Sequence, residues 1–104
     1  TMPVKEAINV EIQTKLKIPR KYKVLIYNDD FTPMNFVVTI LQTVLDKQYQ
    51  EAVRLMMCVH KGNFAVVGIY TKDIAQTKVM DATGQARAEG YPLKLEAVPE
   101  EKEV

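Results

Sequence analysis

Residues 22–34 read YKVLIYNDDFTPM, and this stretch contains a strand pattern, a polar turn and a helix start in immediate succession. Apolar residues at 22, 24 and 26 recur at every second position, which is the period of a strand with one buried face. Asn28-Asp29-Asp30 interrupts this alternation. Thr32-Pro33 predicts a helix start, because a threonine oxygen can cap free amides and proline suits the first helical position.

The rest of the chain predicts two further helices and two further strands. Apolar residues recur with helical spacing through residues 36–45 and again through residues 52–60. Residues 64–70 are nearly all apolar, which predicts a central strand covered on both faces. Thr71 is expected to cap a third helix that ends at a left-handed Gly90, and residues 93–97 alternate as a last strand.

This order of elements predicts the fold class. Three strands and three helices in the order β-α-α-β-α-β predict one α+β domain, with the helices packed on a small, mostly antiparallel, three-stranded sheet. Residues 20–98 form the predicted core domain, and the charged residues 99–104 form a tail. Residues 1–19 carry isolated apolar side chains among polar ones, so they predict either an arm that folds on contact with a partner or a docked strand.

Composition limits the class of protein. The 104 residues are 47% hydrophobic and 26% charged, as in ordinary globular domains. A formal net charge of +1 argues against a nucleic-acid-binding protein, which normally has a basic excess. Cys58 is the only cysteine, so an internal disulfide is excluded, and no apolar stretch has transmembrane length. These features predict a soluble cytoplasmic protein.

The polar triplet Asn28-Asp29-Asp30 is the first candidate for chemistry. Such residues commonly form turns, and the two carboxylates would complement the positive end of the following helix. They also form a set of acceptors suited to a cation such as an ammonium group. His60, at the end of the second predicted helix, is either a partner of the helix dipole or a further acceptor.

Catalytic motifs are absent from the sequence. There is no nucleophile–base pair, no glycine-rich phosphate loop and no zinc-ligand spacing, so no enzyme activity and no cofactor are expected. A metal-dependent hydrolase built on Asp29, Asp30 and His60 is the weakest alternative that the residues leave open.

Several motifs together resemble the ClpS family of Clp protease adaptors. They are residues 22–34, Met56-Met57-Cys58-Val59-His60, Gly68-Ile69-Tyr70-Thr71, Ala75-Gln76-Thr77-Lys78-Val79 and Pro92-Leu93. The resemblance spans residues 20–97 and implies the same β-α-α-β-α-β fold. It implies an adaptor that binds destabilising N-terminal residues (Phe, Tyr, Trp, Leu) of substrate proteins and delivers them to the AAA+ unfoldase of the Clp protease.

The resemblance also implies roles for individual residues. Asn28, Asp29 and His60 would bind the α-amino group of the substrate, and Asp30 and Thr32 would shape the site. The pocket for the first side chain would be lined by Met34, Val37, Ile40, Met56, Val59 and Leu93. Asp73, Thr77 and Lys78 would contact the N-terminal domain of a ClpA-type unfoldase, and residues 1–19 would be a flexible arm that modulates it.

Two departures and one alternative accompany this resemblance. Asn35 stands where family members commonly have Glu, and residues 80–90, with Gly84 inside the predicted helix, are unlike typical members, which would fit a divergent paralogue. The alternative function is a non-enzymatic interaction module of ribosomal-stalk-like α+β design. That alternative explains the fold and the small charge, but leaves the Asn28-Asp29-Asp30 triplet and His60 without a role.

Overall fold

The computed structural model describes residues 20–100 as one α+β domain. Its elements follow the predicted order: β1 (Lys21–Tyr27), α2 (Met34–Thr43), α3 (Tyr49–Gly62), β2 (Phe64–Thr71), α4 (Lys72–Ala88) and β3 (Lys94–Pro99). The predicted arm, residues 1–19, and residues 101–104 of the predicted tail lie outside the described residues. Pairing with β1 extends past residue 98, since β3 includes Pro99 and the Glu100 N–H donates to the Lys21 carbonyl over 2.8 Å.

The sheet is antiparallel, but its central strand is not the predicted one. The strand order is β2-β1-β3, so β1 is central and β2 lies at an edge. The prediction of a central, doubly covered strand at residues 64–70 is therefore wrong. Phe64, Val66 and Ile69 of β2 are 52%, 41% and 50% exposed. The pairing of β1 with β2 shifts by one residue between Val24 and Leu25, and the extra residue in β2 is the buried Val67. This extra residue breaks the alternation of buried and exposed positions along β2, so residues 64–70 do not show the period of an edge strand.

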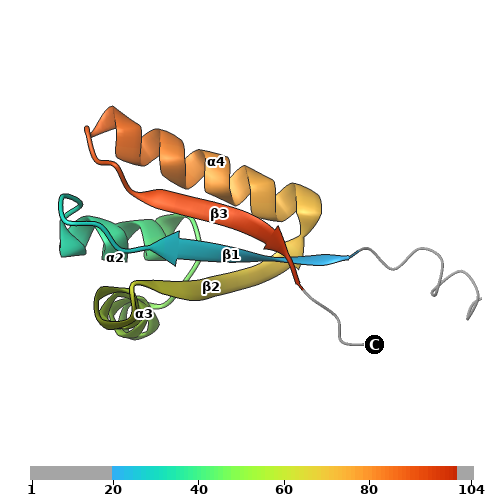
Figure 1. Cartoon of the computed structure of the whole chain (residues 1–104), viewed down its shortest axis with the longest axis horizontal. Helices are drawn as coiled ribbons and strands as arrows, with labels where there is room; N and C mark the ends of the chain where they lie inside the picture. Colours follow the sequence, from blue (N-terminus) through green and yellow to red (C-terminus); the bar gives the residue numbers. More distant parts are fainter. Residues whose placement is uncertain (1–19, 101–104) are drawn as a thin grey trace, which may run out of the picture.

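All three helices pack on the face of the sheet that carries Val24, Ile26 and Val67. Figure 1 shows α4 along the β3 side of the sheet and α2 with α3 toward the β2 side. The buried alanines of α4 (Ala75, Ala82 and Ala86) have no exposed surface, so this helix approaches the sheet closely. The core consists of one cluster of apolar side chains between the helices and this face.

The starts of α2 and α4 differ from the prediction, whereas the end of α4 agrees with it. Pro33, rather than Thr32, is the N-cap of α2, and neither Thr71 at the start of α4 nor Pro33 makes a side-chain capping bond. The hydroxyl of Thr32 instead donates to Asp29. Gly90 has the predicted positive φ of 82°, which few other residues adopt without strain. Within residues 20–100, no helix is long and apolar enough to cross a membrane.

Candidate functional site

The turn between β1 and α2 is organised by the carboxylate of Asp29. Its Oδ1 accepts hydrogen bonds from the backbone N–H of Phe31 over 2.8 Å and of Thr32 over 2.7 Å. Its Oδ2 accepts the hydroxyl of Thr32 over 2.8 Å. Partial burial alone would raise the pKa of Asp29, but these three bonds and the charge of Arg87 hold it below its ordinary value. Asp29 is therefore ionised and committed to the turn, whereas its neighbour Asp30 is exposed.

A backbone bond connects this turn to the end of α3. The N–H of Asn28 donates to the carbonyl of Asn63 over 2.7 Å. Asn63 is the C-cap of α3 and has a left-handed φ of 76°, which reverses the chain into β2. His60 lies in the last turn of α3, three residues before Asn63, and is exposed. The polar triplet and the single histidine, distant in sequence, thus belong to neighbouring segments at one end of the sheet.

A groove of about 390 Å³ runs between α2 and α3 and includes two of the predicted pocket residues. Met34, which is 44% exposed, and the half-buried Met56 contribute from α2 and α3. The sequence analysis missed the other lining residues, which are Asn35, Val38, Thr39, Gln42, Tyr49 and Val53. Met34, Val38 and Gln42 are spaced four residues apart, so they lie on one face of α2. This spacing is visible in the sequence and could have predicted these lining residues.

The remaining predicted pocket residues lie deeper. Val37, Val59 and Leu93 are 7%, 3% and 1% exposed, and Ile40 has no exposed surface. Each belongs to the core cluster between the helices and the sheet. In this conformation all four are therefore core residues, and none of them lines the groove that Met34 and Met56 border.

Arg87 holds the segment that carries Leu93. Its Nη1 donates to the carbonyls of Tyr91 and Leu93, over 2.8 Å in each case. The ring of Tyr91 packs edge-on against Phe36 of α2, with 4.8 Å between ring centroids. The charge of Arg87 also contributes, as the smallest of several causes, to the lowered pKa of Asp29. Arg87 was not among the predicted site residues, because no motif in the sequence indicates that its side chain turns back to bind the carbonyls of Tyr91 and Leu93.

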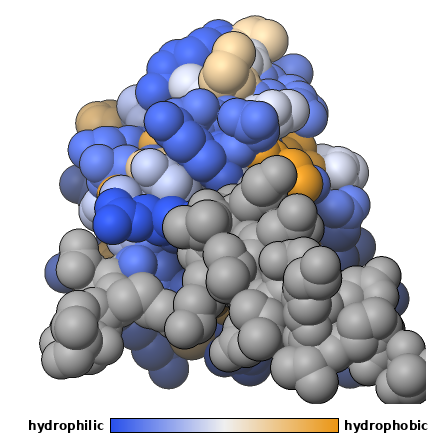
Figure 2. Space-filling view, turned by 90° about the vertical axis from the view of Figure 1, so that its right-hand side faces the viewer, coloured by the Kyte–Doolittle hydropathy of each residue, from blue (hydrophilic) through white to orange (hydrophobic). Residues whose placement is uncertain are grey.

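The predicted unfoldase-binding residues lie together on α4. Asp73, Thr77 and Lys78 line, with Ile74, a surface hollow of about 200 Å³. Figure 2 faces the end of the molecule at which α4 begins, and its surface there is mostly polar with smaller apolar patches. Lys78 is partly buried, and its Nζ donates to the Val44 carbonyl over 2.8 Å and to Asp46 over 3.1 Å.

Within the part of the chain that the structure describes, no three His, Cys, Asp or Glu side chains lie close enough to hold a metal ion. Asp29, Asp30 and His60 therefore do not form the metal centre that the weakest alternative required. The turn instead leaves the carboxylate of Asp30 exposed, and Met34, four residues further along the chain, lines the groove between α2 and α3.

Known proteins resemble this chain over most of its length. A family model described as ATP-dependent Clp protease adaptor protein ClpS matches residues 17–96. The ClpS adapter of Deinococcus radiodurans is 46% identical over 88 residues, which are 85% of this chain and 78% of the relative. That of Oleidesulfovibrio alaskensis is 40% identical over 93 residues, which are 89% of each chain.

A solved structure has the same fold. Agrobacterium tumefaciens ClpS2 bound to L-phenylalaninamide matches with a TM-score of 0.77 and 39% identity, covering 79% of this chain and 99% of that one. The curated relatives are named as adapter proteins of a protease rather than as enzymes. This decides between the two main hypotheses of the sequence analysis in favour of the adaptor. By its sequence and its fold, the chain belongs to the ClpS family of Clp protease adaptor proteins.

Proposed function

We propose that this adaptor binds proteins whose first residue is large and apolar (Phe, Tyr, Trp or Leu) and delivers them to the Clp unfoldase. The observation that carries the proposal is the bond between the N–H of Asn28 and the carbonyl of Asn63, which keeps the polar triplet beside the end of α3. The relative bound to L-phenylalaninamide supports it, because that ligand joins a free α-amino group to an aromatic side chain.

The α-amino group is the feature that distinguishes a chain end from internal peptide. As an ammonium group it has three N–H donors and no acceptor. The side-chain oxygen of Asn28, a carboxylate and the neutral imidazole of His60 supply three acceptors. Charge-assisted bonds of this kind contribute about 1.5–3 kcal/mol each. Binding therefore depends on the free amine as well as on the first side chain.

The two carboxylates have different roles in this proposal. Sequence reasoning assigned Asp29 to the amine and Asp30 to shaping the site. Both oxygens of Asp29 already accept bonds from Phe31 or Thr32, so Asp29 acts by fixing the turn and by its negative charge. Asp30 is exposed and adjacent, and we assign to it the direct contact with the ammonium group.

The first side chain enters the apolar space that Met34 and Met56 border. Val37, Val59 and Leu93, which are nearly buried in the core cluster, would form its floor when the two methionines move apart. Methionine suits this position, because its unbranched side chain adapts to ligands of different shape. Burial of a Leu or Phe side chain contributes about 1.5–3 kcal/mol. With the amine contacts and after association costs, an affinity near micromolar, about −8 kcal/mol, is expected.

Delivery would use a second surface, the hollow at Asp73, Thr77 and Lys78 on α4, for the N-terminal domain of a ClpA-type unfoldase. Separate surfaces would allow the adaptor to hold cargo and unfoldase at once. Binding rather than catalysis is the proposed activity, and its cytoplasmic location remains a prediction from the sequence.

Fluorescence polarisation with short labelled peptides tests the binding step. Peptides that begin with Phe or Leu should bind, and N-acetylation should weaken binding at least about tenfold, or about 1.4 kcal/mol. A Gly-start peptide of otherwise identical sequence is the matched control for the side-chain pocket. Equal affinity for the free and acetylated peptides would contradict the proposal.

A further inference from the structure

The groove between α2 and α3 extends past Met34 along α2. Its lining includes Val38 and Gln42, which follow Met34 by four and eight residues. At the rise of an α-helix they lie about 6 Å and 12 Å further along the helix axis. Val38 is 8% exposed, so it belongs to the floor of the groove, whereas Gln42 is exposed. The space beside Met34 is therefore one end of a longer groove.

The side of the groove formed by α3 has a matching row of side chains. Tyr49, Val53 and Met56 line the groove and are spaced four and three residues apart, so they lie on one face of α3. His60 follows Met56 by four residues and continues this row toward the turn after β1. The row therefore leads from a proposed acceptor for the amine, through a methionine, to a valine and an exposed tyrosine.

The lining of the groove is uncharged. Among its eight lining residues, all within residues 34–56, none is Asp, Glu, Lys, Arg or His. Asn35, Thr39 and Gln42 are exposed and form a polar rim on α2, above the buried Val38. Burial of a charged side chain without a partner is costly, so this groove favours an uncharged segment with an apolar side chain toward its floor.

The repeat of the helix matches the repeat of an extended peptide. Alternate side chains of an extended chain point to the same side and are about 6.6 Å apart. This is close to the distance of about 6 Å between Met34 and Val38 along α2. A peptide that lies along α2 with its first side chain beside Met34 would therefore place its third side chain beside Val38, and its second side chain toward solvent.

We infer, on the basis of the proposed function, that this groove binds the third residue of the substrate chain and selects an uncharged, apolar one. The substrate lies extended along α2, and its third side chain packs against Val38 and Val53. The occupant is the substrate because the groove is continuous with the space at Met34 and Met56 that the first side chain enters. The second residue faces solvent and is not selected.

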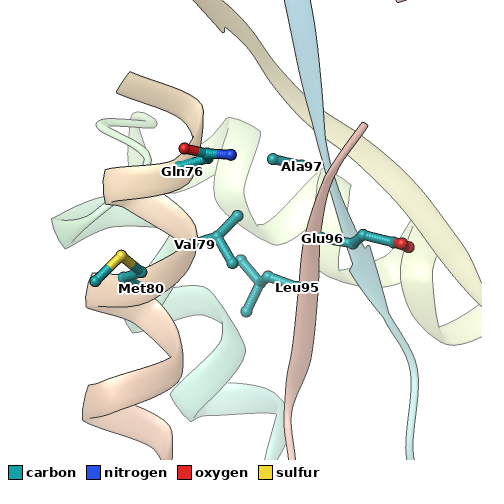
Figure 3. A pocket seen from close by; sticks show the side chains of 6 residues that line it. All are labelled: Gln76, Val79, Met80, Leu95, Glu96 and Ala97. Atoms are coloured by element: carbon teal, nitrogen blue, oxygen red, sulfur yellow. The ribbon is translucent and has the colours of Figure 1, made fainter. Parts of the chain in front are cut away.

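A second groove of about 390 Å³, between α4 and β3, supplies a control surface. Figure 3 shows Val79 and Leu95 facing each other across it and Glu96 directed away. Met80 of α4 also lines it and is 73% exposed. None of its lining residues belongs to α2, α3 or the turn after β1, so it is separate from the proposed path of the substrate.

Fluorescence polarisation with peptides that begin with Leu tests the selection. The peptides share one sequence and carry Leu, Ala, Glu or Lys at either the second or the third residue. Leu at the third residue should bind at least about fivefold more tightly than Ala, because it buries more apolar surface. The same exchange at the second residue should change the affinity by less than about twofold. Glu and Lys at the third residue should both bind more weakly than Leu.

A charge introduced at Thr39 tests the contact itself, because Thr39 is exposed and lines the groove beside Val38. The measured quantity is the ratio of affinities for peptides with Lys and with Glu at the third residue. This ratio should rise at least about threefold in Thr39→Glu and fall at least about threefold in Thr39→Lys. A loss of folded protein would weaken both peptides alike and could not produce these opposite changes.

Met80→Glu and Met80→Lys are the matched controls and should leave the ratio as in the native protein. Equal affinity for Leu and Ala at the third residue would overturn the inference, and the proposed function would stand. A ratio that ignores the charge at Thr39, or that responds equally to the charge at Met80, would also overturn it. Failure of every Leu-start peptide to bind would instead overturn the proposed function, and this inference with it.

Discussion

The backbone N–H of Asn28 donates a 2.7 Å hydrogen bond to the carbonyl of Asn63, the residue that ends α3. This bond joins two segments that are 35 residues apart and places the turn after β1 beside the turn before β2. The ligand acceptors of the proposed site therefore depend on the pairing of β1 with β2, which brings Tyr27 opposite Phe64 one step earlier.

Substitutions at Asp29 and Asp30 should have different effects, because Asp29 stabilises the turn and Asp30 is proposed to bind the ligand. Asp29→Ala removes the acceptor of three bonds and should lower the free energy of unfolding at pH 7 by about 0.5–2 kcal/mol, as for a lost helix cap. Asp30→Ala, at an exposed position, should leave stability unchanged but weaken peptide binding. Urea denaturation and fluorescence polarisation measure the two effects. Equal loss of stability in both variants would contradict this division.

The stabilising effect of Asp29 should depend on pH. The pKa of Asp29 is lowered from its ordinary value of 3.8 in the folded protein. Its contribution is therefore present above the pKa of the unfolded chain and is lost as the pH falls through the lower, folded value. Stability of the native protein and of Asp29→Ala should differ at pH 7 and pH 5, begin to converge near pH 3.8, and converge fully only below the lower, folded pKa. A difference that stays constant down to pH 2.5 in urea titrations would exclude an ionic origin.

Peptide binding should weaken in mild acid through His60. Histidine is the side chain that changes charge between pH 5 and pH 8, and a protonated imidazole would offer no acceptor and would repel the ligand ammonium group. Affinity should therefore be lower at pH 5 than at pH 7. His60→Gln, which retains an acceptor without a titrating charge, should bind with little pH dependence. The same pH profile in His60→Gln would show that another group is responsible.

Met34 should exclude first residues that branch at Cβ. Fixing the amine fixes the ligand Cα, so an extra methyl at Cβ would contact the wall at the pocket entrance, at a cost of about 1–3 kcal/mol. Met34→Ala should raise the affinity for Ile- and Val-start peptides at least about tenfold relative to Leu-start peptides. Because Met34 is 44% exposed, the melting temperature of the Met34→Ala variant should be close to that of the native protein. A uniform loss of affinity for all peptides would reject this selective role.

Lys78 should matter for stability as well as for any partner. Lys78→Ala removes the ammonium group that donates to the Val44 carbonyl and to Asp46. It also removes the cation–π contact of this group with the Tyr70 ring, whose centroid is 5.5 Å away. The free energy of unfolding should fall by about 1–2 kcal/mol. Asp73→Ala and Thr77→Ala, at exposed positions, should leave stability unchanged and weaken binding of the unfoldase N-terminal domain in calorimetry. Unchanged binding in both of these variants would remove this face of α4 from the proposed interface.

Local sequence predicted the elements and their order because each has its own period and its own boundary residues. The alternation around Val24 and Ile26 and the left-handed stop at Gly90 are examples that the structure confirms. The residue types alone marked the triplet Asn28-Asp29-Asp30 and His60 as candidates, but their joint role in binding an α-amino group came from the resemblance to a family. No periodic signal connects a turn at residue 28 with a helix end at residue 60.

The sequence by itself determined the number, type and order of the elements and the family to which the chain belongs, because periodicity and motifs are properties of neighbouring residues. Tertiary structure alone decided that β1 is the central strand and that Lys78 binds the Val44 carbonyl. The physical reason is that each outcome depends on partners distant in sequence. An apolar run such as residues 64–70 does not reveal which of its faces a helix will cover, and a lysine does not reveal which carbonyl group its ammonium group will reach.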